Sequence, residues 1–417
     1  MCDIHQHFNT TKVDDIPGTV HSQLATLNLQ RTVQPGQSVA VTAGSRGIAN
    51  IATILRATVD YLKSLGAAPF IVPAMGSHGG GTVAGQREVL AGLGVTEESV
   101  GAEIRGTMET VVVAETSFGI PVHFDRFAFE ADHVLVVNRV KPHTRFIGPI
   151  ESGLHKMMLI GLGKHEGAKV YHGGIMKHSF SEMIDSVAEV VLQKCGILGG
   201  LAILENAIDE TGHLEAVPPE QFATREPELL KQAVEWLPVL PFAEADLLIV
   251  DRIGKNISGA GMDANIVGRK YNDHVATADD VARCLRIFVR SLTEETHGNA
   301  TGIGMAEFTT QRCVDQVDPV KTRTNCITAN HPEAAMIPIV FDTDAEAVDA
   351  ALQTIGMVEP KDARVIQISD TLHLSRTRVS EAYFSLVKQS DKLEFVGEPY
   401  DFPVDAAGWM SAVGHGR

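Results

Sequence analysis

The sequence predicts an α/β protein of two domains, each built on a mainly parallel sheet, with an active-site cleft between them. Its 417 residues exceed what one ordinary hydrophobic core supports, so two domains are expected. Hydrophobic residues make up 44% and charged residues 21%, which is the composition of a globular protein. Short apolar runs alternate with helical periodicity, an order typical of parallel strands covered by helices.

The first half of the chain shows this alternation most clearly. A buried strand is expected at 38–44, followed by a helix with apolar residues at helical spacing over 51–65. A second strand at 68–76 enters a glycine-rich loop, and a second helix follows at 86–94. Further strands are predicted at 108–116, 133–140 and 201–208, the last being the final strand of this domain.

A segment rich in proline and glutamate, residues 217–245, separates the two halves. Its centre is helical and proline breaks both ends, so we place the domain boundary there. Residues 1–240 are predicted to form an N-terminal α/β domain for catalysis and cofactor binding. Residues 241–417 are predicted to form a C-terminal α/β domain that contributes to the substrate cleft. Its strands are expected within 246–254, 334–343 and 364–369.

Charge and composition argue against several locations and partners. The formal net charge of −17 disfavours binding to nucleic acid or to an anionic membrane surface. No apolar run approaches the roughly 18 residues of a membrane span, and the first residues lack a signal peptide's basic start. A cytoplasmic location is therefore expected. The five cysteines include no Cys-x-x-Cys pair, so imidazole is the better candidate metal ligand.

Polar loops follow several predicted strands, where ligands gather in parallel sheets. Arg46 is either a bidentate clamp for a substrate carboxylate or an ordinary surface arginine. His78 lies among glycines that would let a phosphate approach main-chain N–H groups, or else in a solvated turn. His143 follows Pro142 after the next strand. Because the fold gathers strand ends, we expect these histidines to converge.

Lys156 and the histidines around it form the densest polar segment of the chain. Apolar residues after Lys156 indicate a helix entering the core, where a partly desolvated amine becomes nucleophilic; a lysine that snorkels from a helix end is the commoner case. Lys141 and Lys164 remain alternatives to it. His165 and His178 compete with His172 as metal ligands.

Residues 40–175 resemble the lactate racemase family, whose members use a nickel-pincer nucleotide. That family has a Thr-Arg after a strand, a Gly-Thr-His, a Pro-His at a strand end, a Ser-Gly-x-x-Lys and a later histidine. The corresponding residues here are Ser45-Arg46, Gly76-Ser77-His78, Pro142-His143, Ser152-Gly153-Leu154-His155-Lys156 and His172.

The resemblance implies a role for each matched position. Lys156 would be joined covalently to the cofactor through a thioamide, and His172 would be the protein ligand to nickel. His78 and His143 would be the paired acid/base groups on either side of a 2-hydroxy acid, and Arg46 would hold its carboxylate. Further cofactor contacts are assigned to Gly76, Ser77, Gly79, Ser152 and Gly153, and a further substrate contact to Ser45.

Departures from the family pattern indicate a substrate other than lactate, such as a larger or sugar-derived acid. The separation between His143 and Lys156 is 156 − 143 = 13 positions, about three more than in the lactate racemases. The family's Tyr-Gln-x-x-Lys pattern is missing from the second half, where the polar loop 254–269 stands after a strand. It is predicted either to bind substrate or to be an ordinary connection, with loops 301–312 and 321–326 as secondary candidates. Its candidate substrate contacts are Lys255, Asn256, Ser258 and Asp263.

The preferred interpretation is therefore a racemase or epimerase of a 2-hydroxy acid that works by hydride transfer to a nickel-pincer nucleotide. A zinc-dependent hydrolase or lyase using His78, His143 and His172 as ligands is the main alternative. A protein that only binds a carboxylate or nucleotide is the third. Expected partners are the small-molecule acid and the cofactor's biosynthetic enzymes, with no nucleic acid and no membrane; a homo-oligomer is left open.

Overall fold

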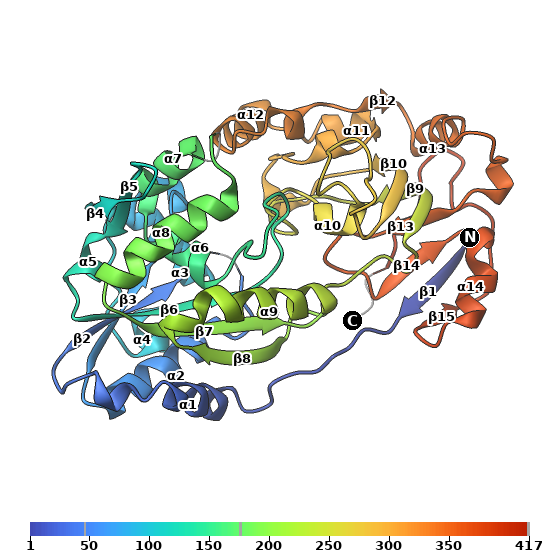
Figure 1. The fold of residues 1–417 in the computed structure, drawn as a ribbon. Helices are drawn as coiled ribbons and strands as arrows, with labels where there is room; N and C mark the ends of the chain where they lie inside the picture. The colour runs from blue at the N-terminus through green and yellow to red at the C-terminus, as the bar shows by residue number, and fades with distance from the viewer. Residues whose placement is uncertain (46, 175–176, 415–417) are drawn as a thin grey trace. The chain divides into compact units, whose positions relative to one another are not determined.

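The computed structural model describes residues 1–45, 47–174 and 177–414, and for His172 only the main chain. The chain forms two compact units. One comprises Asn9–Leu237; the other combines Met1–Phe8 with the part of the chain after Leu237 (Figure 1). The change of unit near residue 237 lies close to the expected boundary. The first eight residues, which we expected in the N-terminal domain, instead supply a strand to the C-terminal unit.

The N-terminal unit is built on a five-stranded sheet. Its strands β3, β2, β6 and β7 are parallel neighbours, and β8 pairs antiparallel with β7 at the edge. The predicted strand 201–208 is therefore not the final one, because a turn with Asp209 at positive φ returns the chain as β8. The strands are β2 (Ser38–Ala43), β3 (Ala68–Pro73), β6 (His133–Arg139), β7 (Ile197–Glu205) and β8 (Thr211–Val217).

Two further strands stand apart from this sheet. β4 (Thr110–Glu115) was predicted as a strand, and it pairs antiparallel with β5 (Pro121–Asp125) alone. None of the residues of β4 is fully buried, so it lacks the two buried faces of a strand inside a parallel sheet.

Helices cover both faces of the five-stranded sheet because alternate strand residues point to opposite sides. Val134 and Val136 pack in one apolar cluster, with α8 (Phe180–Lys194) and α9 (Phe222–Glu235). Leu135 and Val137 pack in another, with α1 (Ile16–Thr26) and α2 (Ile51–Ser64) (Figure 1). The other helices are α3 (Val83–Gly92), α4 (Glu97–Val100), α5 (Arg126–Glu130), α6 (Leu154–Lys156) and α7 (Lys164–Gly174).

The C-terminal unit is built on an eight-stranded sheet in the order β12-β11-β10-β9-β13-β14-β1-β15. The five strands from β12 to β13 are parallel, and the last three pair antiparallel. These strands are β1 (Cys2–Gln6), β9 (Glu244–Val250), β10 (Arg283–Val289), β11 (Phe308–Thr310), β12 (Ile339–Phe341), β13 (Val365–Ile368), β14 (Arg376–Val379) and β15 (Leu393–Val396). Its helices are α10 (Ala264–Val267), α11 (Gln311–Val314), α12 (Pro319–Thr328), α13 (Asp344–Leu352) and α14 (Phe384–Gln389). The predicted α/β class with mainly parallel sheets is confirmed.

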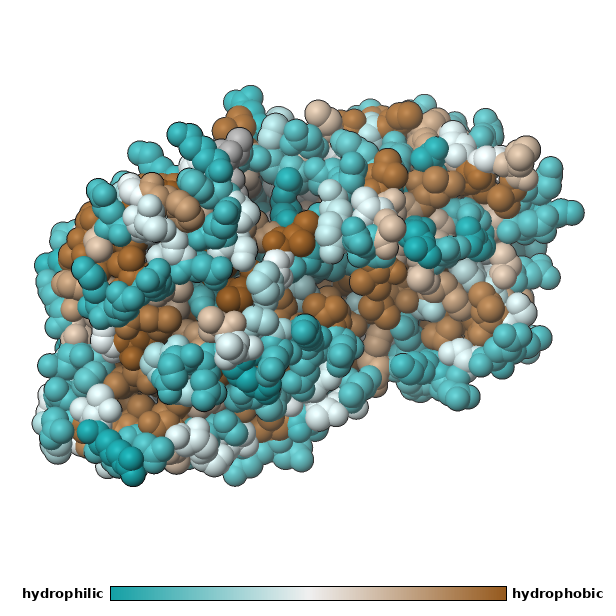
Figure 2. Space-filling model, viewed as in Figure 1, coloured by the Kyte–Doolittle hydropathy of each residue, from teal (hydrophilic) through white to brown (hydrophobic). Residues whose placement is uncertain are grey.

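Three further features concern the surface, the helices and the cysteines. Hydrophilic residues cover most of the face shown in Figure 2, and apolar residues appear there in small groups. Among the described residues, no helix combines the length and the apolar character needed to cross a membrane. The five cysteines are all buried and free.

Candidate active site

The predicted polar loops of the N-terminal unit follow three neighbouring parallel strands. Ser45 comes after β2, His78 after β3 and His143 after β6, so all three lie beyond the same edge of the sheet. The edge is closely packed. A Cβ built on Gly44 would lie 3.3 Å from the Met157 methyl group, which places the segment after Lys156 against the β2 loop.

His78 and its loop are held by a side chain from the loop after β2 and by one from α3. Its Nδ1 is hydrogen-bonded to the hydroxyl of Ser45. The Gln86 amide donates to the carbonyl oxygens of Gly76 at 2.9 Å and His78 at 3.4 Å, and its own oxygen accepts from Lys164 at 3.4 Å. A hydroxyl can donate or accept, so Ser45 leaves the Nε2 atom of His78 able to accept a proton.

Gly79 explains why the loop of His78 is rich in glycine. Its φ is +66°, and a Cβ there would lie 2.5 Å from the carbonyl carbon of Gly85 in α3. A side chain would therefore push the loop away from the helix. Gly76 (φ +59°) meets the carbonyl oxygen of Ile160 in the same way, at 3.1 Å.

Lys164, one of the two alternatives to Lys156, is committed to a structural contact. Its ammonium lies 2.8 Å from the Asp125 carboxylate, both side chains are fully buried, and it also donates to the carbonyl of Pro73. Burial lowers the pKa of Lys164, and the adjacent Asp125 carboxylate opposes that shift. Through these two contacts, Lys164 joins Pro73 at the end of β3 to Asp125 at the end of β5. Its amine is therefore engaged and is not available for attachment of a cofactor.

His143 belongs to a second cluster at the same edge. The ring Nδ1 of His143 accepts hydrogen bonds from the main-chain nitrogens of Arg145 and Phe146, each at 3.1 Å. The main-chain N–H of His143 donates to the Glu151 carboxylate at 2.8 Å. Main-chain nitrogens can only donate. The neutral ring therefore carries its proton on Nε2 and presents a donor there.

Phe146, which the sequence analysis missed, connects His143 with Lys156. Its ring stacks on the His143 ring at 4.2 Å between centroids and on Phe180 at 3.8 Å. The Lys156 ammonium lies 5.2 Å from the Phe146 centroid, a cation–π distance. The pattern His-x-x-Phe at a strand end was the available signal. The structure thus brings Lys156 and His143 together around one aromatic ring.

The Ser-Gly-x-x-Lys motif has a physical explanation here. Gly153 has a φ of +100°, and a Cβ on it would lie 2.1 Å from a carboxylate oxygen of the fully buried Glu226. Its carbonyl accepts from Asn138 at 2.7 Å. The Ser152 hydroxyl bonds to both main-chain groups of Lys141, which closes the loop of His143.

The chain leaves α6 through a π-helical turn, Met157–Gly161, closed by a 2.9 Å hydrogen bond from Leu162 to Met157. Such turns often occur at functional sites. A Cβ on Gly161 would lie 2.8 Å from the Ala74 carbonyl oxygen just after β3. This packing holds the half-buried Lys156 at the sheet edge.

Two predicted residues cannot be placed. Arg46 lies outside the described residues, and so does the side chain of His172, whose main chain belongs to α7. Of the competing ligands, His165 is exposed and His178 stacks on Phe118 at 4.2 Å. Ser77 is half-buried beside His78.

The four polar residues predicted in loop 254–269 of the C-terminal unit each have a partner inside that unit. Lys255 donates to the Gly259 carbonyl, and Asn256 accepts from Thr293 at 2.6 Å. The Ser258 hydroxyl accepts from the Ala260 nitrogen at 3.3 Å, and Asp263 caps α10 by accepting from the Asn265 nitrogen at 3.0 Å. These contacts fix the shape of the loop.

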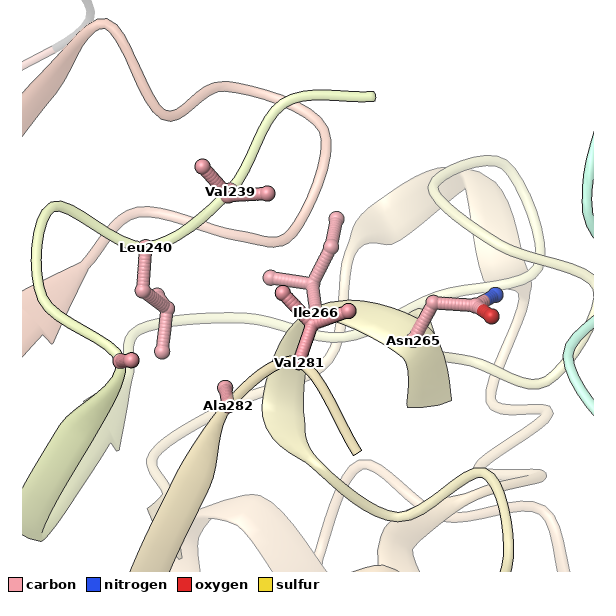
Figure 3. Close-up of a pocket in the computed structure, with 7 residues that line it drawn as sticks. Val239, Leu240, Asn265, Ile266, Val281 and Ala282 are labelled. Atoms are coloured by element: carbon pink, nitrogen blue, oxygen red, sulfur yellow. The ribbon is translucent and has the colours of Figure 1, made fainter. Parts of the chain in front are cut away.

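The C-terminal unit contains two hollows. One of about 370 Å³, lined largely by charged and polar residues, lies at the carboxyl edge of its sheet. Of its lining residues only Arg312 falls in a predicted candidate loop, 301–312, although charged residues also directly follow β9 and β10. An apolar one of about 90 Å³ is shown in Figure 3, and its lining includes Ile266 and Val281. The polar hollow is lined by Asp251, Arg252, Arg290, Ser291, Arg312, Gln316, Ser369, Met410, Ala412 and Val413.

A family model and two solved structures are similar to this chain. Residues 8–183 match the family model of the lactate racemase N-terminal domain. The lactate racemase apoprotein from Thermoanaerobacterium thermosaccharolyticum is similar in fold, with a TM-score of 0.55 and 12% identity over 88% of this chain and 94% of that one. A Thermotoga maritima protein gives a TM-score of 0.48 and 12% identity over 85% of this chain and 96% of that one. No curated protein matches the chain in sequence.

The N-terminal unit is therefore a lactate racemase-type α/β domain with a lysine and histidines at the carboxyl edge of its sheet. Residues 8–183 match the lactate racemase N-terminal domain, and the fold of the chain is similar to that of lactate racemase. The resemblance inferred from residues 40–175 is confirmed.

Proposed function

We propose that the protein inverts the configuration of a 2-hydroxy acid other than lactate, using a nickel-pincer nucleotide bound at the edge of the N-terminal sheet. The arrangement of Lys156, Phe146 and His143 is the observation that supports this most strongly. It sets an amine suited to covalent attachment beside an imidazole suited to proton transfer. Both lie in the domain that the lactate racemase model matches.

The residues at this edge fit such a cofactor. Lys156 is half-buried at the end of a short helix, whereas Lys164 forms a buried ion pair with Asp125. In the His78 loop, a Cβ on Gly80 would have no neighbour within 4 Å, so this part of the main chain is open to a ligand. Lys156 would carry the cofactor, and His172 would supply the imidazole ligand to its nickel. Such a cofactor would supply a hydride acceptor for the hydrogen on the substrate Cα.

The chain's own residues would manage the proton and the carboxylate. His78, oriented by Ser45, would accept the proton of the substrate hydroxyl at Nε2. His143, on the opposite side of the substrate, would donate its Nε2–H to the same substrate oxygen, while its Nδ1 accepts from main-chain nitrogens. Arg46, whose structure is not described, would hold the carboxylate in a bidentate pair.

A hydroxylated or sugar-derived acid is the proposed substrate class. Support comes from the C-terminal unit, whose loop 254–269 has an ordered polar structure. The same unit has a hollow whose lining includes Arg252 and Arg312, each of which also pairs with an aspartate at 3.3–3.4 Å. Guanidinium groups and hydroxyl-bearing side chains recognise anionic, hydroxyl-rich molecules better than a methyl group.

The test is an inversion assay on chain produced together with the cofactor's biosynthetic enzymes. Single enantiomers of 2-hydroxy acids and sugar acids are incubated with the protein, and chiral chromatography follows the appearance of the opposite configuration. His78→Ala should reduce inversion by about 10²- to 10⁴-fold, while His21→Ala, which removes an exposed imidazole of α1, should leave it nearly unchanged. Full activity in His78→Ala or in cofactor-free chain would contradict the proposal.

A further inference from the structure

A cluster of metal-ligating side chains lies far from the candidate active site in sequence, on the first strand of the chain. β1 pairs with β15, and His5 stands directly opposite Glu394. His7 follows two residues later, and its nitrogen continues the pairing by donating to the Lys392 carbonyl at 2.8 Å. Residues two apart on a strand point to the same side, so both imidazoles lie on the face of Glu394.

The separations in this cluster do not suit direct hydrogen bonds. His5 Nδ1 lies 3.6 Å and His7 Nε2 lies 3.4 Å from the same Glu394 oxygen, Oε1. Both distances exceed the usual N–H···O range of about 2.7–3.2 Å. They match two ligands of one tetrahedral ion, because atoms about 2.0–2.1 Å from a zinc lie roughly 3.3–3.4 Å from each other. The three ligand atoms all lie within 4.8 Å of one another.

The state of His5 points to a missing partner. Its Nδ1 is buried, yet it forms no hydrogen bond with any residue that the structure describes. A buried polar atom without a partner is costly, and a bound cation would remove that cost. The side chains of His7 and Glu394 are 53% and 61% exposed, so an ion can enter and water can complete its coordination.

A second group of possible ligands, Asp273, His331 and Glu333, differs in this respect. His331 Nε2 lies 2.6 Å from the Asp273 carboxylate, which is a direct hydrogen bond that already satisfies the ring nitrogen. That group therefore carries no comparable argument.

We propose that His5, His7 and Glu394 form a site for a divalent transition-metal ion of the zinc type, with water as the fourth ligand. Two imidazoles and one carboxylate are a ligand set that Zn²⁺ accepts readily. The ion would fasten the first strand of the chain to the last strand of the C-terminal sheet. Because residue 9 already belongs to the other unit, this strand is where the chain leaves the C-terminal unit.

The test uses the full chain without a polyhistidine tag, stripped with a chelator and made without the cofactor's biosynthetic enzymes. Zn²⁺ binding is measured by calorimetry, and the same samples are loaded with Co²⁺ to record its ligand-field absorption. One Zn²⁺ per chain is expected, with affinity at least about tenfold weaker in His7→Asn and in Glu394→Gln. The matched control is His21→Asn, which removes an exposed imidazole on α1 and should bind as the unmodified chain does.

Thermal unfolding supplies a second readout. Excess Zn²⁺ should raise the unfolding midpoint of the C-terminal unit by several degrees, on the order of 5 °C, and this shift should vanish in His7→Asn. Circular dichroism checks that both ligand variants are folded. Equal Zn²⁺ affinity in the unmodified chain and in the His7→Asn, Glu394→Gln double variant would overturn the proposal. Neither result depends on Lys156 or on inversion activity, so the metal site and the proposed function stand or fall separately.

Discussion

The carboxylate of Glu226 accepts hydrogen bonds from both the main-chain nitrogen and the Nδ1 atom of His155, the residue immediately before Lys156. The nitrogen-to-oxygen distance on the main chain is 3.1 Å, and both side chains are almost fully buried. Glu226 belongs to α9, so this contact positions α6, and with it Lys156, from a helix 71 residues away along the chain. It also explains the glycine at 153, since the carboxylate occupies the space of a Cβ there.

Removal of this carboxylate should destabilise the N-terminal unit. We expect Glu226→Ala to lower its free energy of unfolding by about 1–3 kcal/mol, because the buried main-chain nitrogen and ring of His155 lose their hydrogen-bond acceptor. Urea denaturation followed by Trp236 fluorescence in a Trp409→Phe background measures this, since Trp236 is the only other tryptophan of the chain. The control Glu235→Ala, at the exposed end of α9, should change stability by less than about 0.5 kcal/mol. A loss of similar size in both variants would show that Glu226 has no special role.

The buried pair of Lys164 and Asp125 gives a second prediction. Lys164→Met leaves the Asp125 carboxylate buried and unpaired, and we expect a loss of about 3–5 kcal/mol in the free energy of unfolding. The double variant Lys164→Met, Asp125→Leu should recover most of that loss, because it removes both charges together. The same denaturation experiment measures both. If the double variant is no more stable than the single one, the ion pair is not the source of the effect.

The hydrogen bond between Ser45 and His78 should affect catalysis rather than folding. Ser45→Ala frees the Nδ1 atom of a mostly exposed ring, so stability should change little while inversion falls by roughly tenfold. Ser45→Thr, which keeps the hydroxyl, should restore most of the rate. An unchanged inversion rate in Ser45→Ala would contradict this role.

Acid should weaken the attachment of α9. The pKa of Glu215 lies below its ordinary value near 4.5, chiefly because Arg225 donates to the carboxylate, with His213 adding to this against the effect of burial. A lowered folded-state pKa means that the stabilisation is complete above the unfolded pKa and is lost as the pH falls through the folded one. The difference in free energy of unfolding between the unmodified chain and Glu215→Gln should therefore be constant near neutral pH and shrink below about pH 4. A difference that stays constant down to pH 3 would refute this assignment.

The fold class could be read from the sequence because parallel strands buried on both faces appear as continuous apolar runs, as in β2, β6 and β9. The membership of β1 in the C-terminal unit could not be read, because an antiparallel strand at residue 2 finds its partners near residues 379 and 396. No local pattern specifies pairing at that separation. β8 was missed because the short turn at Asp209 follows an apolar strand without a break in composition.

In the candidate site, residue types and spacing identified Lys156, His78 and His143, but not what orients them. Phe146 and Glu226 act through contacts that depend on the packed structure, one across a loop and the other from a distant helix. The proton position on His143 also follows only from the turn that aims two main-chain nitrogens at its Nδ1. Loop 254–269 illustrates a different limit of the sequence. Its polar residues were predicted to contact substrate, and the structure gives them partners within their own unit.

The most direct test of the central proposal is the intact mass of the chain after production with the cofactor's biosynthetic enzymes, followed by peptide mapping and nickel analysis. We predict one covalent adduct on Lys156 with one nickel per chain; the adduct should be lost in Lys156→Ala and kept in Lys141→Ala. An enzyme that inverts a 2-hydroxy acid while its mass is unmodified and its nickel content is zero would contradict it.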